Sequence, residues 1–168
     1  MKIAHISILP AYSPGVFKKL ENKAQISKHD NLGFDFYYLN PIKEMNLENL
    51  YLIKKTYNWI PTVLIRTFAF RFFKMCVIQK MIPLEQYDAI VLRYPLADGI
   101  CNKSYIEKYG NKTFTEHHSD EISELFAVGR KVDLIRAKIE KIFSGAFLSN
   151  MAGIIGVTDE IRKIELQK

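Results

Sequence analysis

Residues 2–29, "KIAHISILPAYSPGVFKKLENKAQISKH", contain the pattern that decides the fold. They open with an apolar, β-branched run that ends at Pro10, a composition typical of a buried strand. A short loop follows, and then Val16, Leu20, Ala24 and Ile26 recur near one face of a helix. A strand followed directly by a helix is the repeating unit of α/β proteins.

The same alternation continues along the chain. Strands are predicted at residues 34–40, 87–95, 112–117 and 152–157, and helices at 46–81 (broken before Pro61), 100–109, 131–147 and 159–167. The helix at 131–147 has apolar residues at spacings of three and four, namely Val132, Ile135, Ile139, Ile142, Phe143 and Ala146. Ser119 is predicted to cap a further helix, with Asp120 and Glu121 in its first turn. The predicted fold is α/β, a Rossmann-like open parallel sheet with helices on both faces.

Length and composition set the class of protein. The 168 residues are enough for one domain, which we expect to span 1–168, and lysine and arginine exceed the acids by 24 to 18. An excess of +6 allows an anionic partner without requiring one.

Cys76 and Cys101 form no Cys-x-x-Cys motif, so no metal site is predicted. The N-terminal apolar run is too short and too polar for a signal peptide, and we expect a cytoplasmic protein.

Ligands of open parallel sheets bind beyond the carboxyl ends of the strands, so the loops there hold the candidate residues. The first loop, "PAYSPGV", contains Tyr12, Pro14 and Gly15 but neither G-x-G-x-x-G nor the G-K-S/T of a P-loop. No cofactor is therefore predicted. Gly15 at a helix N-terminus can bring backbone N–H groups close to a phosphate. A flexible turn at a helix entry would use the same residue.

Two further strands end in residues suited to binding. Arg93 and Tyr94 end one of them, and this arginine can hold a phosphate or carboxylate, or form a surface ion pair. His117 and His118 end the other. Adjacent strand residues face opposite sides, so one histidine is expected to face a ligand while the other packs, which argues against a shared metal.

These pieces, in this order, resemble the amino-terminal half of a GT-B glycosyltransferase of the large retaining family that uses nucleotide sugars (family 4). The matching segments are "MKIAHIS", "SPGVFKKLENKA", "YDAIVLRYP", "KTFTEHH" and "AGIIGVTDEIRKIEL". They span the whole chain, and their order is more specific than any one of them. The first loop departs from the family pattern, because only Gly15 stands where two adjacent glycines are usual.

The resemblance implies transfer of a sugar, with retention, from a nucleotide diphosphate sugar to a glycan or lipid-linked acceptor, as in bacterial surface polysaccharide synthesis. His118, or else His117, would contact the transferred sugar. The residues expected to bind substrate are Tyr12, Pro14 and Gly15 of the first loop, Arg93 and Tyr94 on the acceptor side, and Thr158 and Glu160 after the last strand.

The family's donor-binding domain, with its E-x7-E motif, would begin where this chain ends. Residues 1–168 alone are then expected to be inactive. Glu116 and Glu124 fit E-x7-E by spacing, but we reject this match because the family's motif lies in the second domain.

A basic, aromatic window lies between Glu48 and Glu85. It has no acid and six basic residues, Lys54, Lys55, Arg66, Arg71, Lys74 and Lys80, and these charges exclude a membrane-spanning helix. The pattern suits a helix lying on an anionic membrane, with contacts from Lys55, Trp59, Arg66, Arg71 and Lys74. The family resemblance implies that this membrane is the inner face of the plasma membrane. A core-packing helix with a solvated basic face is the alternative. Nucleic acid is not an expected partner, since no RNA- or DNA-binding motif is present.

Two other functions compete with the enzyme half. A stand-alone flavodoxin-like or Rossmann-like binding or regulatory module, without catalysis, fits the fold. A receiver-type module would need acids after the first strand, where the sequence reads "ILPAYS". A complete small nucleotide-dependent enzyme would need one of the two absent phosphate-binding motifs.

Overall fold

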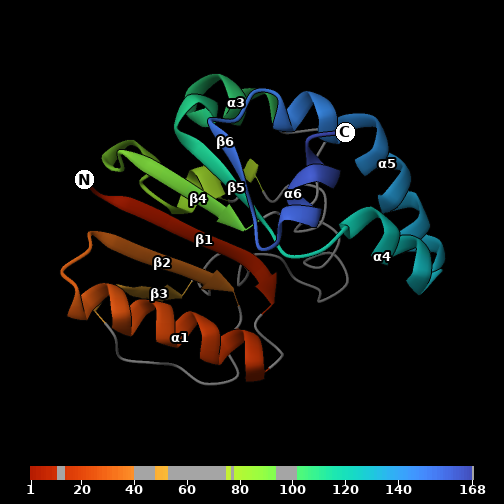
Figure 1. The fold of residues 1–168 in the computed structure, drawn as a ribbon. Helices are drawn as coiled ribbons and strands as arrows, with labels where there is room; N and C mark the ends of the chain where they lie inside the picture. The colour runs from red at the N-terminus through yellow and green to blue at the C-terminus, as the bar shows by residue number, and fades with distance from the viewer. Residues whose placement is uncertain (11–13, 40–47, 53–74, 77, 94–101, 168) are drawn as a thin grey trace, which may run out of the picture.

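The strands of the sheet all run in the same direction. The computed structural model describes residues 1–10, 14–39, 48–52, 75–76, 78–93 and 102–167. The strands are β1 (Ile3–Pro10), β2 (Phe34–Leu39), β3 (Leu50–Leu52), β4 (Ala89–Arg93), β5 (Thr113–His117) and β6 (Gly153–Gly156), each parallel to its neighbours. Their order is β3-β2-β1-β4-β5-β6 (Figure 1). This is the strand order of Rossmann folds, so the predicted fold class is confirmed.

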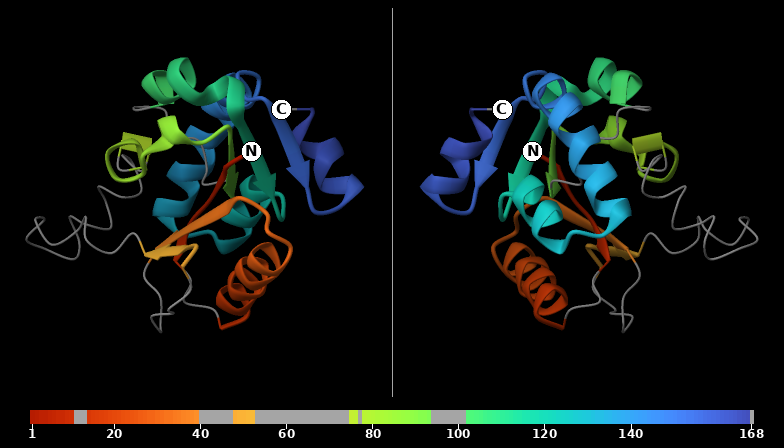
Figure 2. Two further views of the ribbon diagram at one scale, coloured as in Figure 1. Left: turned by 90° about the vertical axis from the view of Figure 1, so that its left-hand side faces the viewer. Right: turned by 90° about the vertical axis from the view of Figure 1, so that its right-hand side faces the viewer.

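Helices cover both faces of this sheet. They are α1 (Pro14–His29), α3 (Asn102–Tyr109), α4 (Glu121–Val128), α5 (Lys131–Leu148) and α6 (Asp159–Glu165), with 3-10 turns at Leu84–Gln86 and Gly110–Lys112. Residues 75–76 and 78–81 are also helical. Figure 2 shows α1 and α5 on opposite sides of the sheet. The chain order reverses between β1 and β4, and ligands of such sheets bind beyond the carboxyl ends of the strands at this point.

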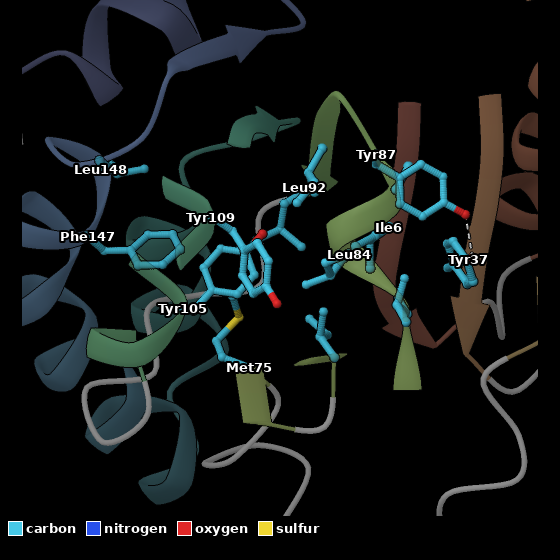
Figure 3. Packing of buried hydrophobic residues seen from close by; sticks show 14 residues of the cluster. Ile6, Tyr37, Met75, Leu84, Tyr87, Leu92, Tyr105, Tyr109, Phe147 and Leu148 are labelled. Carbon is cyan, nitrogen blue, oxygen red and sulfur yellow. Dashed lines mark hydrogen bonds between the residues drawn. The ribbon is translucent and has the colours of Figure 1, made fainter. Parts of the chain in front are cut away.

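Alternation along the strands builds a separate core on each face. The larger core gathers Ala4, Ile6, Tyr37, Met75, Ile78, Ile82, Leu84, Tyr87, Ile90, Leu92, Tyr105, Tyr109, Phe147 and Leu148 (Figure 3). The smaller one packs Leu20 and Ala24 of α1 against Phe36 and Tyr38 of β2. Because successive side chains of β1 point to opposite faces, Ala4 and Ile6 enter the larger core. His5 lies on the other face, with its ring 5.3 Å from that of Phe36.

Polar residues close the larger core at the amino ends of the strands. The Tyr87 hydroxyl donates to Asp35 Oδ2 at 2.6 Å, and the Tyr37 and Tyr87 hydroxyls lie 2.6 Å apart (Figure 3). Lys2 Nζ is 3.1 Å from the same Asp35 oxygen. Burial, reinforced by the hydrogen bond to Asp35, raises the pKa of Tyr87, so this side chain stays a neutral donor.

Two local predictions were wrong. Asp120, not Ser119, is the N-cap of α4, because its side chain accepts a hydrogen bond from the Ser123 backbone N–H. Within the predicted helix at 46–81, residues 50–52 form the edge strand β3, which pairs with Phe36–Tyr38 of β2. A strand of this length is too short to show an apolar periodicity in the sequence. It forms because it pairs with β2.

The orientation of α5 reverses the usual arrangement of an amphipathic helix. Its inward face consists of Asp133, Ala137, Glu140 and Ser144, together with Phe147 and Leu148 near its end. The apolar stripe noted in the sequence points outward instead, since Ile135 is 55% exposed and Ile142 70% exposed. A stripe of this kind normally faces the core.

Gly110 joins α3 to β5 at a point of close approach. A Cβ at this position would lie 2.5 Å from the backbone oxygen of Asn150. We predict that Gly110→Ala lowers the free energy of unfolding by about 1–3 kcal/mol, because the backbone has to move to relieve the clash. Urea denaturation measures the change. Asn111→Ala, at an exposed neighbouring position, is the control and should change stability by no more than about 0.5 kcal/mol.

Candidate functional site

A row of polar residues crosses the sheet at the carboxyl ends of its central strands. Ser7 of β1 is the register partner of Arg93 of β4, and Arg93 is the partner of Glu116 of β5. Register partners on parallel strands point to the same face, so these side chains share the face that α1 covers. Ser7 and Glu116 are buried and Arg93 is half-buried. The row lies at the reversal of strand order, where ligands of this fold bind.

Glu116 is the centre of this site. Its Oε1 accepts a hydrogen bond from Lys23 Nζ of α1 at 2.8 Å, and its Oε2 is 3.0 Å from His5 Nε2 of β1. His118 Nε2 lies 3.5 Å from the same Oε2. Burial alone would raise the pKa of the Glu116 carboxyl, but the hydrogen bonds and charges of His5 and Lys23 outweigh it and hold the pKa well below the usual range. Glu116 is therefore a buried, ionised carboxylate at neutral pH.

His118 lies at the edge of the site and has a different electrostatic environment. Its side chain is 29% exposed. Burial lowers its pKa, and the charge of Arg93 lowers it further against the opposing effect of Glu116. The imidazole is therefore neutral at pH 7 and can accept a proton or exchange hydrogen bonds with a hydroxyl group.

Three buried polar atoms beside this carboxylate have no hydrogen-bond partner among the described residues. They are His5 Nδ1, Arg93 Nε and His118 Nε2. Buried polar groups are normally paired with protein or water, and unpaired ones commonly mark the position of a water or a ligand. Lys23 and Arg93 carry two positive charges against the single charge of Glu116. The site thus has a net positive charge and suits a polar ligand with anionic groups.

His117 occupies the opposite face of β5 and is fully buried. Its Nε2 is 3.1 Å from Thr115 Oγ1, and its Nδ1 is 3.3 Å from Oε2 of Glu165, a buried residue of α6. These contacts join α6 to the end of β5. The structure therefore separates the two histidines, with His118 beside the polar row and His117 in the interior.

The other predicted residues lie in several places. Thr158 is the N-cap of α6, accepting from the Ile161 backbone N–H at 3.3 Å, and Glu160 is exposed in the first turn of that helix. Pro14 and Gly15 begin α1. Lying outside the described residues are Tyr12 and Tyr94, together with the expected membrane contacts Lys55, Trp59, Arg66, Arg71 and Lys74.

Sequence reasoning missed the roles of His5, Lys23 and Glu116. The signal for His5 was present, because it interrupts the apolar run of β1 at a position whose side chain has to be buried. Lys23 offered no such signal, since it is one of several lysines on α1. Glu116 was considered only for its spacing from Glu124, which is exposed on α4.

Comparisons with protein-family models, with curated proteins and with solved structures yield no match for this chain. Within the described ranges, no group of three or more His, Cys, Asp and Glu side chains is placed to hold a metal ion. In the same part of the chain, no helix combines the length and apolar character needed to cross a membrane.

The low pKa of Glu116 predicts a specific pH dependence of stability. Since the folded-state pKa lies below the ordinary value of 4.5, the folded protein binds fewer protons than the unfolded chain under acidic conditions. The contribution of Glu116 is fully present above about pH 5 and is lost as pH falls through 4.5 toward the folded-state pKa. We predict that Glu116→Gln costs about 1.5–3 kcal/mol at pH 7 and flattens the acid limb of the stability curve.

Urea denaturation at several pH values between neutral and acid measures this effect. The matched control is Glu124→Gln, which removes an exposed carboxylate eight residues along the chain and should change both quantities much less. An unchanged acid limb in Glu116→Gln would contradict the assignment of Glu116 as the buried, ionised group.

Proposed function

We propose that residues 1–168 form the acceptor-binding half of a retaining glycosyltransferase. The reaction would move a sugar from a nucleotide diphosphate sugar to a glycan or lipid-linked acceptor, in bacterial surface polysaccharide synthesis. The observation that supports it is the arrangement of Arg93, Glu116 and His118 at the reversal point of a Rossmann-order sheet. The family resemblance implies a sugar-contacting histidine at this strand end.

The chemistry of these groups suits such a ligand. A sugar presents hydroxyl groups that both donate and accept hydrogen bonds, and the neutral His118 imidazole can do the same. Arg93 Nε has no hydrogen-bond partner among the described residues, so its N–H could donate to an oxygen of the substrate. Glu116 accepts a hydrogen bond from Lys23, and its second oxygen lies 3.5 Å from His118 Nε2.

Charge on the departing nucleoside diphosphate has to be balanced during transfer. Lys23 and Arg93 give the site a positive excess, and the cationic groups of the donor-binding domain expected beyond Lys168 would supply most of the stabilisation. On this proposal the two domains share the reacting sugar between them, and neither is sufficient alone.

The first test is an activity assay on the chain 1–168 and on the longer protein that its gene is expected to encode. Both are incubated with a panel of nucleotide diphosphate sugars and with glycan and lipid-linked acceptors, and release of nucleoside diphosphate is followed. We predict turnover by the longer protein and little or none by 1–168. Robust turnover by 1–168 would contradict the half-enzyme proposal, and inactivity of both would favour a binding module.

The second test compares the two histidines in the active protein. His118→Ala should lower kcat by about 10²–10³, the cost of losing one hydrogen bond made in the transition state, with little change in melting temperature. His117→Ala is the matched control and should reduce the free energy of unfolding by about 3–5 kcal/mol, because it leaves Glu165 buried without this partner. A wild-type kcat in His118→Ala would remove His118 from the reaction.

A further inference from the structure

The outward face of α5 alternates cations with large apolar side chains. Lys131, Ile135, Lys138 and Ile142 follow one another at spacings of three and four, so they form a single stripe along the helix. Ile142 is the most exposed of these apolar residues, at 70%. Helices of soluble proteins normally present polar residues to water in this position. The stripe is therefore suited to a contact that buries the isoleucines while the lysines remain charged.

The neighbouring helix extends this stripe into a surface. α4 packs against α5, and Figure 1 shows the two helices side by side, away from α1. The exposed apolar residues here are Phe126 and Val128 at the end of α4 and Ile135, Ile142 and Phe143 of α5, and the exposed cations are Arg130, Lys131, Lys138 and Lys141. We call these residues the α4–α5 surface. Exposed apolar residues gathered on two adjacent helices are suited to an interaction site.

The distribution of charge identifies the kind of partner. Both acids of α5, Asp133 and Glu140, are buried on its inward face, so every exposed charged side chain of this helix is a lysine. The exposed Glu124 of α4 is outnumbered by these lysines and Arg130. An apolar stripe with lysines along it matches a bilayer interface, where apolar side chains enter the acyl boundary and lysines reach anionic headgroups. A second copy of the chain would place these lysines against each other, which is unfavourable.

We propose that the α4–α5 surface docks this protein onto membranes that contain anionic lipids. The helices lie on the membrane, with Ile135, Ile142 and Phe143 in the interface and the lysines at headgroup level. This proposal does not depend on glycosyl transfer. The proposed membrane contact is also different from the one predicted for the basic window between Glu48 and Glu85, because its residues lie in α4 and α5.

Vesicle co-sedimentation of the whole chain tests the proposal, using phosphatidylcholine vesicles with and without phosphatidylglycerol. Binding should require phosphatidylglycerol and weaken as salt is added. Lys138→Gln with Lys141→Gln should weaken binding roughly thirtyfold. Ile135→Gln with Ile142→Gln should weaken it at least about tenfold. The matched control, Ile26→Gln with Leu32→Gln, changes apolar residues of comparable exposure elsewhere and should leave binding unchanged.

A fluorescence reporter shows which surface touches the lipid. The chain has one tryptophan, so Trp59→Phe provides a silent background. In this background Phe143→Trp should be quenched by lipids with brominated acyl chains, whereas Ile26→Trp on α1 should not.

Three results would overturn the proposal. One is no binding to phosphatidylglycerol vesicles at low salt. Another is binding that survives both double variants and leaves the Phe143→Trp reporter unquenched, which would place the contact in another segment. The third is a protein that is dimeric in solution, does not bind vesicles, and becomes monomeric in the variant Ile135→Gln with Ile142→Gln. The α4–α5 surface would then bind a second copy of the chain.

Discussion

An ionised carboxylate buried at the carboxyl edge of a parallel sheet needs positive charge around it, and the arrangement of this site follows from that need. Glu116 obtains it from Lys23 of α1, and His5 of β1 lies within hydrogen-bonding distance of its other oxygen. The compensation thereby ties α1 to β5 across the face of the sheet. Removing either partner from such a group costs far more than a surface ion pair contributes. The same carboxylate lies within reach of His118, so one electrostatic requirement fixes both the packing of α1 and the position of the candidate catalytic group.

Strand alternation gives β5 two different roles. Glu116 and the following His118 take one face at the end of the strand, beside the polar row, while Thr115 and His117 take the other. On that second face His117 binds Glu165 and so holds α6 against the end of the sheet. A single strand end thus combines the partly exposed His118 with a buried polar contact. The neutral state of His118 results from its partial burial and from Arg93 on the adjacent strand.

The packing of α5 shows how far a periodic pattern can mislead. The sequence displays a clear apolar stripe, yet the structure turns Ala137, Glu140 and Ser144 inward and Ile135 and Ile142 outward. Aromatic and aliphatic side chains from the strands, α3 and the end of α5 already fill the core beneath it. Periodicity reports that a helix has two chemically distinct faces, but the neighbouring elements determine which face is covered. An apolar face left outward indicates a partner, which is why α5 carries the membrane proposal.

The sequence by itself determined the alternation of strands and helices, and with it the parallel sheet, because the apolar periods of two and of nearly four are local properties of the chain. It also placed Arg93, His117 and His118 at strand ends, where this fold binds ligands. Only the tertiary structure decided that Lys23 and His5 reach the Glu116 carboxylate, because these contacts join residues distant in the chain. The short strand β3 likewise exists only through its pairing with β2. Burial, register and charge compensation depend on neighbours in space, and a local pattern does not contain them.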